Sequence, residues 1–214
     1  MNIINEQVDE YIRHLYQPLN DNLKKLREDA EEKNIPIILP DTETLLLSLI
    51  KLKKPKEILE IGTAIGYSAS CFAISDEECK ITTVETDKDL CQVAKSNILD
   101  LGLKERITVI NGKGQEIIPT LTKSYDLVFI DAAKSHYRAF WDEAIKICSE
   151  NAMIVCDNVL MRGTTVSDEY DPYRKHRTSI RRMREFLNYI SNLENTTFSL
   201  LPIGDGISIS ILKG

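Results

Sequence analysis

Polar side chains stand at the ends of two apolar runs that are typical of buried strands. The run 126–131 ends on Asp131, and the run 152–157 ends on Asp157 and is followed by Asn158. Because the carboxyl ends of parallel strands converge on one crevice, these three side chains should lie together. Two carboxylates and an amide oxygen form an all-oxygen set with open positions, which suits Mg²⁺ or another divalent cation better than zinc. The sequence therefore predicts a metal site, with capping of the following segments as the alternative.

Lys134 is the candidate for a catalytic base. It follows Asp131 by three residues and could reach the same crevice. A divalent cation nearby would disfavour its ammonium form, and a neutral amine is what a general base requires. A solvated loop lysine is the alternative. The three histidines are scattered along the chain, so no histidine–cysteine cluster competes for the metal.

A strand, a glycine turn and a helix follow one another in residues 57–74. The apolar run 57–61 stops at Gly62, and Gly66 precedes the helical segment. Open α/β sheets build nucleotide pockets from this arrangement. The dinucleotide fingerprint, however, has a glycine where Ala64 stands, and Glu60 would repel a pyrophosphate. A cationic, phosphate-free ligand such as S-adenosylmethionine fits better, and an ordinary tight strand–helix turn is the alternative.

Two further polar positions extend this pocket. Glu85 ends the predicted strand 81–85, 23 residues after Gly62. A carboxylate about 20 residues past such a turn commonly accepts hydrogen bonds from both ribose hydroxyls. Residues 111–115, which end on Gln115, follow the next predicted strand, where a third loop would close over an adenine. A surface carboxylate at a strand end is the alternative for Glu85.

These residues need a sheet to position them, and the pattern from residue 57 onward supplies one. Predicted strands alternate with predicted helices, which indicates an α/β fold with a doubly wound, mostly parallel sheet. The seven predicted strands are 57–61, 81–85, 107–110, 126–131, 152–157, 196–201 and 207–212, and the later predicted helices are 88–101, 137–148 and 175–191. The last two strands, joined by residues 204–206, should form an antiparallel hairpin.

Residues 1–53 show helical spacing of apolar residues. Pro18 ends the first predicted helix, and Asp41 is the predicted N-cap of a third helix that runs to 51–54 and is closed by Pro55. These helices could cover the substrate mouth or form a dimer face, and the sequence does not choose between the two.

The bulk properties favour one domain over residues 1–214, with 1–53 as a helical cover and 57–214 as the catalytic core. There is no apolar run long enough to span a membrane, and the first residues do not read as a signal peptide. The five cysteines form no CxxC pair, so we expect reduced thiols and a cytoplasmic location.

Over nearly its whole length the chain resembles the small metal-dependent O-methyltransferases, a family that includes catechol and caffeoyl-CoA O-methyltransferases. The motifs that carry the resemblance are Glu60–Ser68, Phe129–Lys134, Asp157–Asn158 and Ile203–Ile207. The resemblance implies the class I methyltransferase fold, which is Rossmann-like, and S-adenosylmethionine as the cofactor.

The resemblance also implies roles for particular residues. Cofactor binding would fall to Glu60, Gly62, Gly66, Tyr67, Ser68, Glu85, Gln115 and Asp131. The metal would lie on Asp131, Asp157 and Asn158, with Lys134 and Asp131 as the catalytic residues. Many bacterial members have Gly-Asp-Ala after the third strand. This chain has Lys113 in place of that acid, so Gln115 becomes the candidate for the adenine contact.

A basic segment at residues 174–184 is relevant to the kind of substrate that the protein could bind. Residues 174–184 carry six basic residues and no acidic one, although the whole chain has a net charge of −6. The arginines proposed to contact phosphates are Arg174, Arg177, Arg181 and Arg184. Such a stripe on an acidic protein is typical of a local phosphate contact, and a solvated helix face is the alternative.

Within the family the strongest resemblance is to bacterial tRNA 5-hydroxyuridine methyltransferases. It implies O-methylation of wobble 5-hydroxyuridine in tRNA to 5-methoxyuridine. The alternative substrates are small catechol or hydroxycinnamoyl-type molecules, because 5-hydroxyuridine and a catechol offer the same pair of adjacent oxygens. An RNA-binding protein with a vestigial cofactor fold and a nicotinamide dehydrogenase are more distant alternatives. We further expect a homodimer that binds neither membrane nor DNA.

Overall fold

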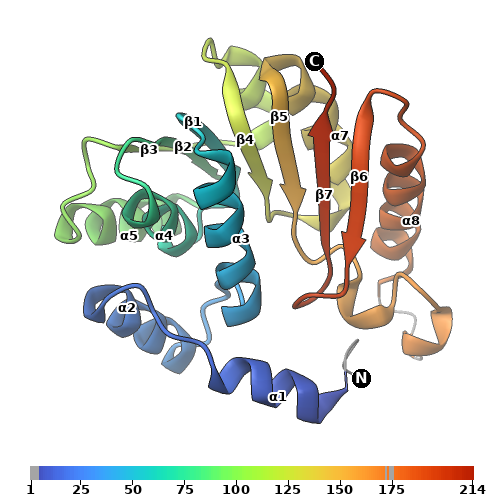
Figure 1. Cartoon of the computed structure of the whole chain (residues 1–214), viewed down its shortest axis with the longest axis horizontal. Helices are drawn as coiled ribbons and strands as arrows, with labels where there is room; N and C mark the ends of the chain where they lie inside the picture. Colours follow the sequence, from blue (N-terminus) through green and yellow to red (C-terminus); the bar gives the residue numbers. More distant parts are fainter. Residues whose placement is uncertain (1–4, 172, 174–175) are drawn as a thin grey trace.

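The computed structural model describes residues 5–171, 173 and 176–214, and its centre is one seven-stranded sheet (Figure 1). The strands are β1 Glu57–Ile61, β2 Lys80–Glu85, β3 Ile107–Asn111, β4 Tyr125–Ile130, β5 Cys148–Cys156, β6 Thr196–Leu201 and β7 Ile207–Leu212. Their order in space is β3-β2-β1-β4-β5-β7-β6. β1 to β5 pair in parallel, whereas β7 is antiparallel to both β5 and β6. The predicted α/β fold with a closing hairpin is confirmed.

The helices cover both faces of this sheet. They are α1 Glu6–His14, α2 Asp21–Glu32, α3 Pro40–Lys53, α4 Tyr67–Ser75, α5 Lys88–Asp100, α6 Gly114–Ile117, α7 Tyr137–Ala144 and α8 Arg177–Ser191. Short 3₁₀ turns lie at η1 Ile118–Thr120, η2 Lys134–His136, η3 Ile145–Ile147, η4 Met161–Gly163 and η5 Asp168–Tyr170. None of the helices in the described ranges is long and apolar enough to cross a membrane.

The sheet is buried on both sides because consecutive strand residues face opposite ways. In β1, Ile58 joins one hydrophobic core with Phe72 of α4, while Leu59 joins a second core with Trp141 of α7. This explains why the central strands are apolar at almost every position rather than at alternate ones. The strand order reverses between β1 and β4, and a crevice forms at the carboxyl ends beside such a reversal.

Several predicted boundaries were wrong for local reasons. The helix predicted over 137–148 ends at Ala144, because a 3₁₀ turn follows it and Cys148 already pairs with Tyr125 of β4. Asp41 is not the N-cap of α3, which begins at Pro40 after Leu39. The Asp41 carboxylate instead accepts hydrogen bonds from the backbone N–H of Thr42 and of Gly204. Lys175, the predicted start of the last helix, lies outside the described residues, and α8 begins at Arg177.

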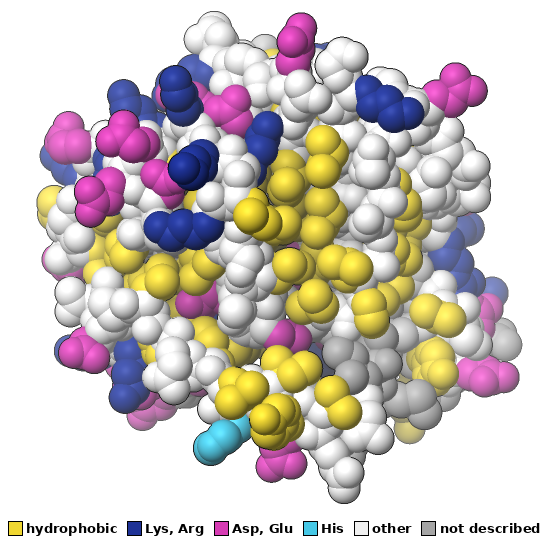
Figure 2. Space-filling view, viewed as in Figure 1, with side chains coloured by type: hydrophobic (Ala, Val, Ile, Leu, Met, Phe, Trp, Pro, Cys, Tyr) yellow, Lys and Arg dark blue, Asp and Glu magenta, His cyan; other side chains and the backbone are white. Residues whose placement is uncertain are grey.

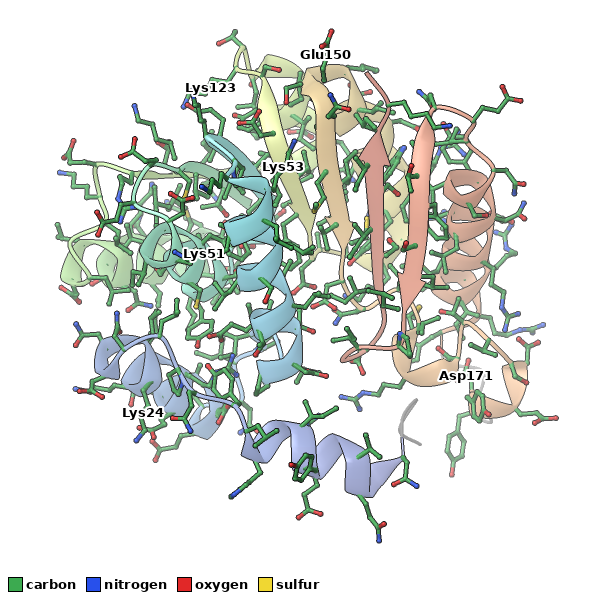
Figure 3. All side chains as sticks on the ribbon, viewed as in Figure 1. Lys24, Lys51, Lys53, Lys123, Glu150 and Asp171 are labelled. Atoms are coloured by element: carbon green, nitrogen blue, oxygen red, sulfur yellow. The ribbon has the colours of Figure 1, made fainter. Side chains whose placement is uncertain are left out.

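The N-terminal helices extend across the carboxyl ends of the parallel strands. α1 and α2 lie below those ends in the view of Figure 1, and α2 and α3 both contact α4. Lys53 is the last residue of α3 and lies at the end of that helix away from α1 (Figure 3). It donates a hydrogen bond to the carbonyl of Asn151 at 2.8 Å. The segment between α2 and α3 lies next to the crevice, because its residues 36–39 line it.

Candidate active site

A cleft of about 970 Å³ opens at the carboxyl edge of the sheet beside β1. Its walls come from the ends of β1, β2, β4 and β5, from the loop before α6 and from residues 36–39 between α2 and α3. The predicted site residues that line it are Gly62, Tyr67, Ser68, Glu85, Gln115, Asp131, Lys134, Asp157 and Asn158. The fold therefore brings the two predicted groups, cofactor residues and metal ligands, into one space.

Backbone geometry explains the glycine turn. Gly62 has φ +107°, and a Cβ there would lie 1.9 Å from the carbonyl oxygen of Asp131. Gly66 has φ +79° and allows α4 to begin close to Ala94 and Ile98 of α5. A side chain at Gly62 would thus push the end of β1 away from the end of β4, two of the strands whose ends line the cleft.

Glu60 lies behind the cleft wall, where it is fully buried. Its carboxylate accepts hydrogen bonds from the hydroxyls of Ser68 and of Thr83, the latter at 2.5 Å. Burial raises the pKa of Glu60 to about 7, although both hydrogen bonds oppose that rise. Of these residues only Ser68 lines the cleft, so Glu60 reaches the cleft through Ser68.

Glu85, the residue predicted to bind the ribose, lines the cleft at the end of β2. Glu85 accepts hydrogen bonds from the backbone N–H of Ala64 at 2.8 Å and of Asp87 at 2.9 Å. These bonds fix its carboxylate on the glycine turn while leaving lone pairs for a diol. Lys113 also lines the cleft and pairs with Glu116 at 3.2 Å.

The predicted metal ligands come together just beyond two strand ends. The N–H of Asp131 bonds to the carbonyl of Ile61 at 3.0 Å, and the N–H of Asp157 bonds to that of Ile130 at 3.0 Å. These bonds continue the parallel ladders by one step and place both carboxylates at the cleft. Asn158 adopts a left-handed φ of +54°, a conformation that asparagine tolerates better than most residues.

The donor set fits a divalent cation. Asp157 is buried, and burial together with the nearby charge of Asp131 raises its pKa well above the usual range. A positive charge nearby would favour the charged form of both carboxylates. Lys134 supplies one: its ammonium lies 3.4 Å from Asp131 Oδ1 and donates to Asn158 Oδ1. Within the described residues no three His, Cys, Asp or Glu side chains form a metal cluster, and the two acids and the amide here are a different kind of set.

Sequence reasoning missed Tyr137. This residue is buried at the start of α7, and its hydroxyl donates to the backbone carbonyl of Asp157 at 2.8 Å. It therefore fixes the backbone from which two of the predicted ligands project. In the sequence Tyr137 reads only as the first residue of a predicted helix, and its hydroxyl partner is 20 residues away.

Two of the predicted phosphate-contacting arginines, Arg184 and Arg181 of α8, have protein partners. Arg184 donates to the carbonyls of Thr164 and Thr165 and lies 2.8 Å from Asp168. Arg181 pairs with Glu185 at 3.1 Å. Arg177 is exposed, and Arg174 lies outside the described residues. Arg184 thus holds the loop that follows Asn158, a role that the helical pattern did not predict.

Comparison with known proteins places these features in a family. The O-methyltransferase family matches residues 15–213. A catechol O-methyltransferase from Niastella koreensis is 28% identical over 99% of this chain and 99% of its own length. Among solved structures, a candidate caffeoyl-CoA O-methyltransferase from Staphylococcus aureus is 31% identical with a TM-score of 0.91, covering 97% of this chain and 100% of that one. The O-methyltransferase TomG from Streptomyces achromogenes, solved in complex with S-adenosylmethionine, is 25% identical with a TM-score of 0.83, covering 97% of this chain and 96% of that one.

Proposed function

The chain belongs to the O-methyltransferase family, and from this premise we propose that it methylates one of two adjacent oxygens on a small aromatic substrate of the catechol or hydroxycinnamoyl type. The general activity is S-adenosylmethionine-dependent O-methylation, as in its catechol and caffeoyl-CoA relatives. The observation that carries the finer proposal is the placement of Asp131, Asp157 and Asn158 in the same cleft as the glycine turn. Such a set would hold two adjacent oxygens beside the methyl donor.

The chain's own residues orient the reaction. The glycine turn, Ser68 and Glu85 would bind the methyl donor, and Asp131, Asp157 and Asn158 would hold a Mg²⁺ ion or another divalent cation. When bound, that cation supplies positive charge that lowers the pKa of a nearby hydroxyl. The Lys134 amine contacts Asp131 Oδ1 and Asn158 Oδ1. A cation held by these oxygens would disfavour its ammonium form, and the neutral amine would accept the hydroxyl proton.

The transfer itself is an in-line displacement. The substrate oxygen forms a bond to the methyl carbon as the bond from that carbon to the sulfonium sulfur breaks. The products are a methyl ether and S-adenosylhomocysteine, and the proton goes to Lys134. Holding oxygen and methyl group in line accounts for much of the expected rate enhancement.

The test is methyl transfer to a catechol and to a hydroxycinnamoyl thioester with excess Mg²⁺. We expect monomethylated product with the wild type, loss of turnover in Asp157→Ala and in excess EDTA, and nearly unchanged binding of S-adenosylhomocysteine by Asp157→Ala. A control, Asp142→Ala, removes an exposed carboxylate that pairs with Arg138 away from the cleft and should leave turnover unchanged. Full activity in excess EDTA would contradict the metal assignment.

A second candidate is methylation of wobble 5-hydroxyuridine in tRNA. One observation favours it: Arg162 lines the cleft, and its side chain is 82% exposed at the rim, where it could meet a phosphate. The 5-hydroxyl and the neighbouring carbonyl of this base offer the same oxygen pair as a catechol. Incubating the wild type with hydroxyuridine-containing tRNA, followed by nucleoside mass spectrometry, separates the two. Formation of 5-methoxyuridine with no turnover of small phenols would favour the tRNA substrate.

A further inference from the structure

A buried polar cluster joins the N-terminal helices to the start of α4. It consists of Arg27 from α2, Glu43 from α3, Tyr67 from α4 and, at its edge, Tyr16 from the turn after α1. Arg27 is 6% exposed and Glu43 is 1% exposed. Three of the four side chains play no part in the chemistry described above, and only Tyr67 lines the cleft.

The contacts within the cluster are close and numerous. Arg27 Nη2 lies 2.8 Å from Glu43 Oε2, and Arg27 Nε donates to the hydroxyl of Tyr67 at 3.1 Å. The Tyr67 hydroxyl in turn donates to Glu43 Oε2 at 2.8 Å. The guanidinium carbon also lies 4.7 Å from the centre of the Tyr67 ring. Arg27 is thus held in one orientation by charge, hydrogen bonds and ring contact together.

The same guanidinium reaches two walls of the cleft without lining it. Arg27 Nη2 donates to the backbone carbonyl of Ile38 at 2.9 Å, and Ile38 lines the cleft. Its second contact, Tyr67, also lines the cleft and directly precedes Ser68, which bonds to Glu60. Residues 36–39 belong to the segment between α2 and α3, and Tyr67 is the first residue of α4, directly after the glycine turn. Arg27 therefore bridges the N-terminal cover and the cofactor loop.

A buried ion pair adds little net stability to a folded protein. Taking both charges out of water offsets most of their attraction, and well-packed apolar residues often stabilise a protein as well. What apolar residues cannot replace is a directed fork of N–H donors that sets the spacing between a carbonyl and a hydroxyl. The contacts of Arg27 are thus better suited to setting the distance between the Ile38 carbonyl and the Tyr67 hydroxyl than to adding stability.

We propose that Arg27 is a positioning residue that fixes the spacing between residues 36–39 and Tyr67, two adjoining parts of the wall of the cofactor cleft. The affinity for the methyl donor then depends on a side chain that does not touch it. This inference rests on the cofactor cleft and not on the identity of the methyl acceptor. Its test uses S-adenosylhomocysteine alone, so the acceptor proposal can fail without affecting it.

The main test replaces the ion pair by apolar residues in a double variant, Arg27→Met with Glu43→Leu. Because no charge is left buried without a partner, we expect the fold to survive. The directed bonds to Ile38 and Tyr67 are lost, so calorimetry should give S-adenosylhomocysteine affinity weaker by about tenfold or more, as expected for the loss of well-placed hydrogen bonds to a charged group. Hydrogen exchange of a peptide spanning 34–42 should become faster.

A matched control separates positioning from general loss of stability. Leu23→Ala removes a fully buried side chain from the same helix, but Leu23 belongs to the hydrophobic core and not to the cluster. We expect it to lower the melting temperature while leaving S-adenosylhomocysteine affinity within about twofold of wild type. The double variant should show the reverse pattern: a smaller loss of melting temperature and a larger loss of affinity.

Arg27→Lys gives a second route if the double variant fails to fold. It keeps the charge beside Glu43 but has no fork to reach both Ile38 and Tyr67, so its affinity should fall severalfold. With a saturating methyl donor the turnover number should approach that of the wild type, which leaves the effect in KM. Wild-type affinity in either folded variant, or equal losses in Leu23→Ala and the Arg27 variants, would overturn the proposal.

Discussion

Glu60 carries a buried carboxylate directly behind the residues that line the cleft. Two hydroxyls, those of Ser68 and Thr83, satisfy it, yet burial still raises its pKa to about 7. An elevated pKa in the folded state means that the native protein holds this proton more tightly than the unfolded chain does. The carboxylate therefore costs the protein some stability at neutral pH, and Ser68, which bonds to it, lines the cleft where the cationic methyl donor would bind.

The pH dependence of stability should reveal this cost. Between the ordinary value of 4.5 and a folded value of about 7, the native state binds more protons than the unfolded state, so the contribution of Glu60 to stability falls as pH rises. Integrated over that window the loss is on the order of 3 kcal/mol. Denaturant unfolding of wild type and Glu60→Gln at pH 5 and at pH 8 measures it, and the variant should gain relative to wild type only at pH 8.

The affinity for S-adenosylhomocysteine provides a second measurement on the same variant. Because the amide of Glu60→Gln carries no charge, the variant should bind S-adenosylhomocysteine more weakly than wild type at pH 8. An equal stability difference between the two proteins at both pH values would show that Glu60 does not titrate in this range.

At the scale of elements, α8 contributes two kinds of arginine. Arg184 bonds to the backbone of the loop after Asn158, whereas Arg177 and Arg181 are exposed on the helix surface. Substituting all of them at once would mix a change in loop structure with a change in surface charge. The two effects are separable only because the structure shows which arginine holds the loop.

The double variant Arg177→Glu with Arg181→Glu changes the surface charge of α8 and removes only the exposed pair of Arg181 with Glu185. If tRNA is a substrate, its binding should weaken strongly and depend less on salt concentration, because fewer counterions are released from the phosphates. Turnover of a small catechol should remain within about twofold of wild type, since neither residue lines the cleft. Filter binding over a salt series and methyl transfer to both substrates provide the measurement. Unchanged tRNA methylation at moderate salt would mean that this surface is a solvated helix face.

At the scale of the whole molecule, apolar side chains remain exposed on one face. Figure 2 shows them gathered on α1 and beside α3 over the sheet. Exposed large apolar residues at these elements are Tyr11 of α1, Leu15 just after it, Leu52 of α3, Leu200 of β6 and Ile211 of β7. Large exposed apolar areas on a protein commonly mark an interface.

We expect the chain to form a homodimer that covers part of this face. Light scattering coupled to gel filtration should give about twice the monomer mass of 24.4 kDa. Leu52→Glu should shift the mass toward the monomer, because it places a charge where apolar contact is expected. Val93→Glu, at an exposed position of α5, serves as the control. A monomeric wild type at micromolar concentration would contradict the expectation.

The sequence by itself determined the alternation of strands and helices, the glycine turn after β1 and the acids that follow β4 and β5. These features are local: the apolar period of a strand, the φ that a glycine allows and the position of an acid after a strand are written in consecutive residues. Parallel connectivity then brings the strand ends to one edge, so the sequence alone predicts that the candidate metal ligands and cofactor residues share one cleft. Boundaries such as the end of α7 were less accurate because pairing with a distant strand decides them.

Only the tertiary structure decided which polar groups meet across elements. Arg27 finds Glu43 and Tyr67 at separations of 16 and 40 residues, Tyr137 finds the carbonyl of Asp157, and Arg184 finds the loop before α8. No sequence period encodes such partners, because they depend on how helices pack on the sheet and on which side chains that packing takes out of water. The sequence therefore determined where the chemistry lies, and the packing of the N-terminal helices decided what holds the cleft in shape.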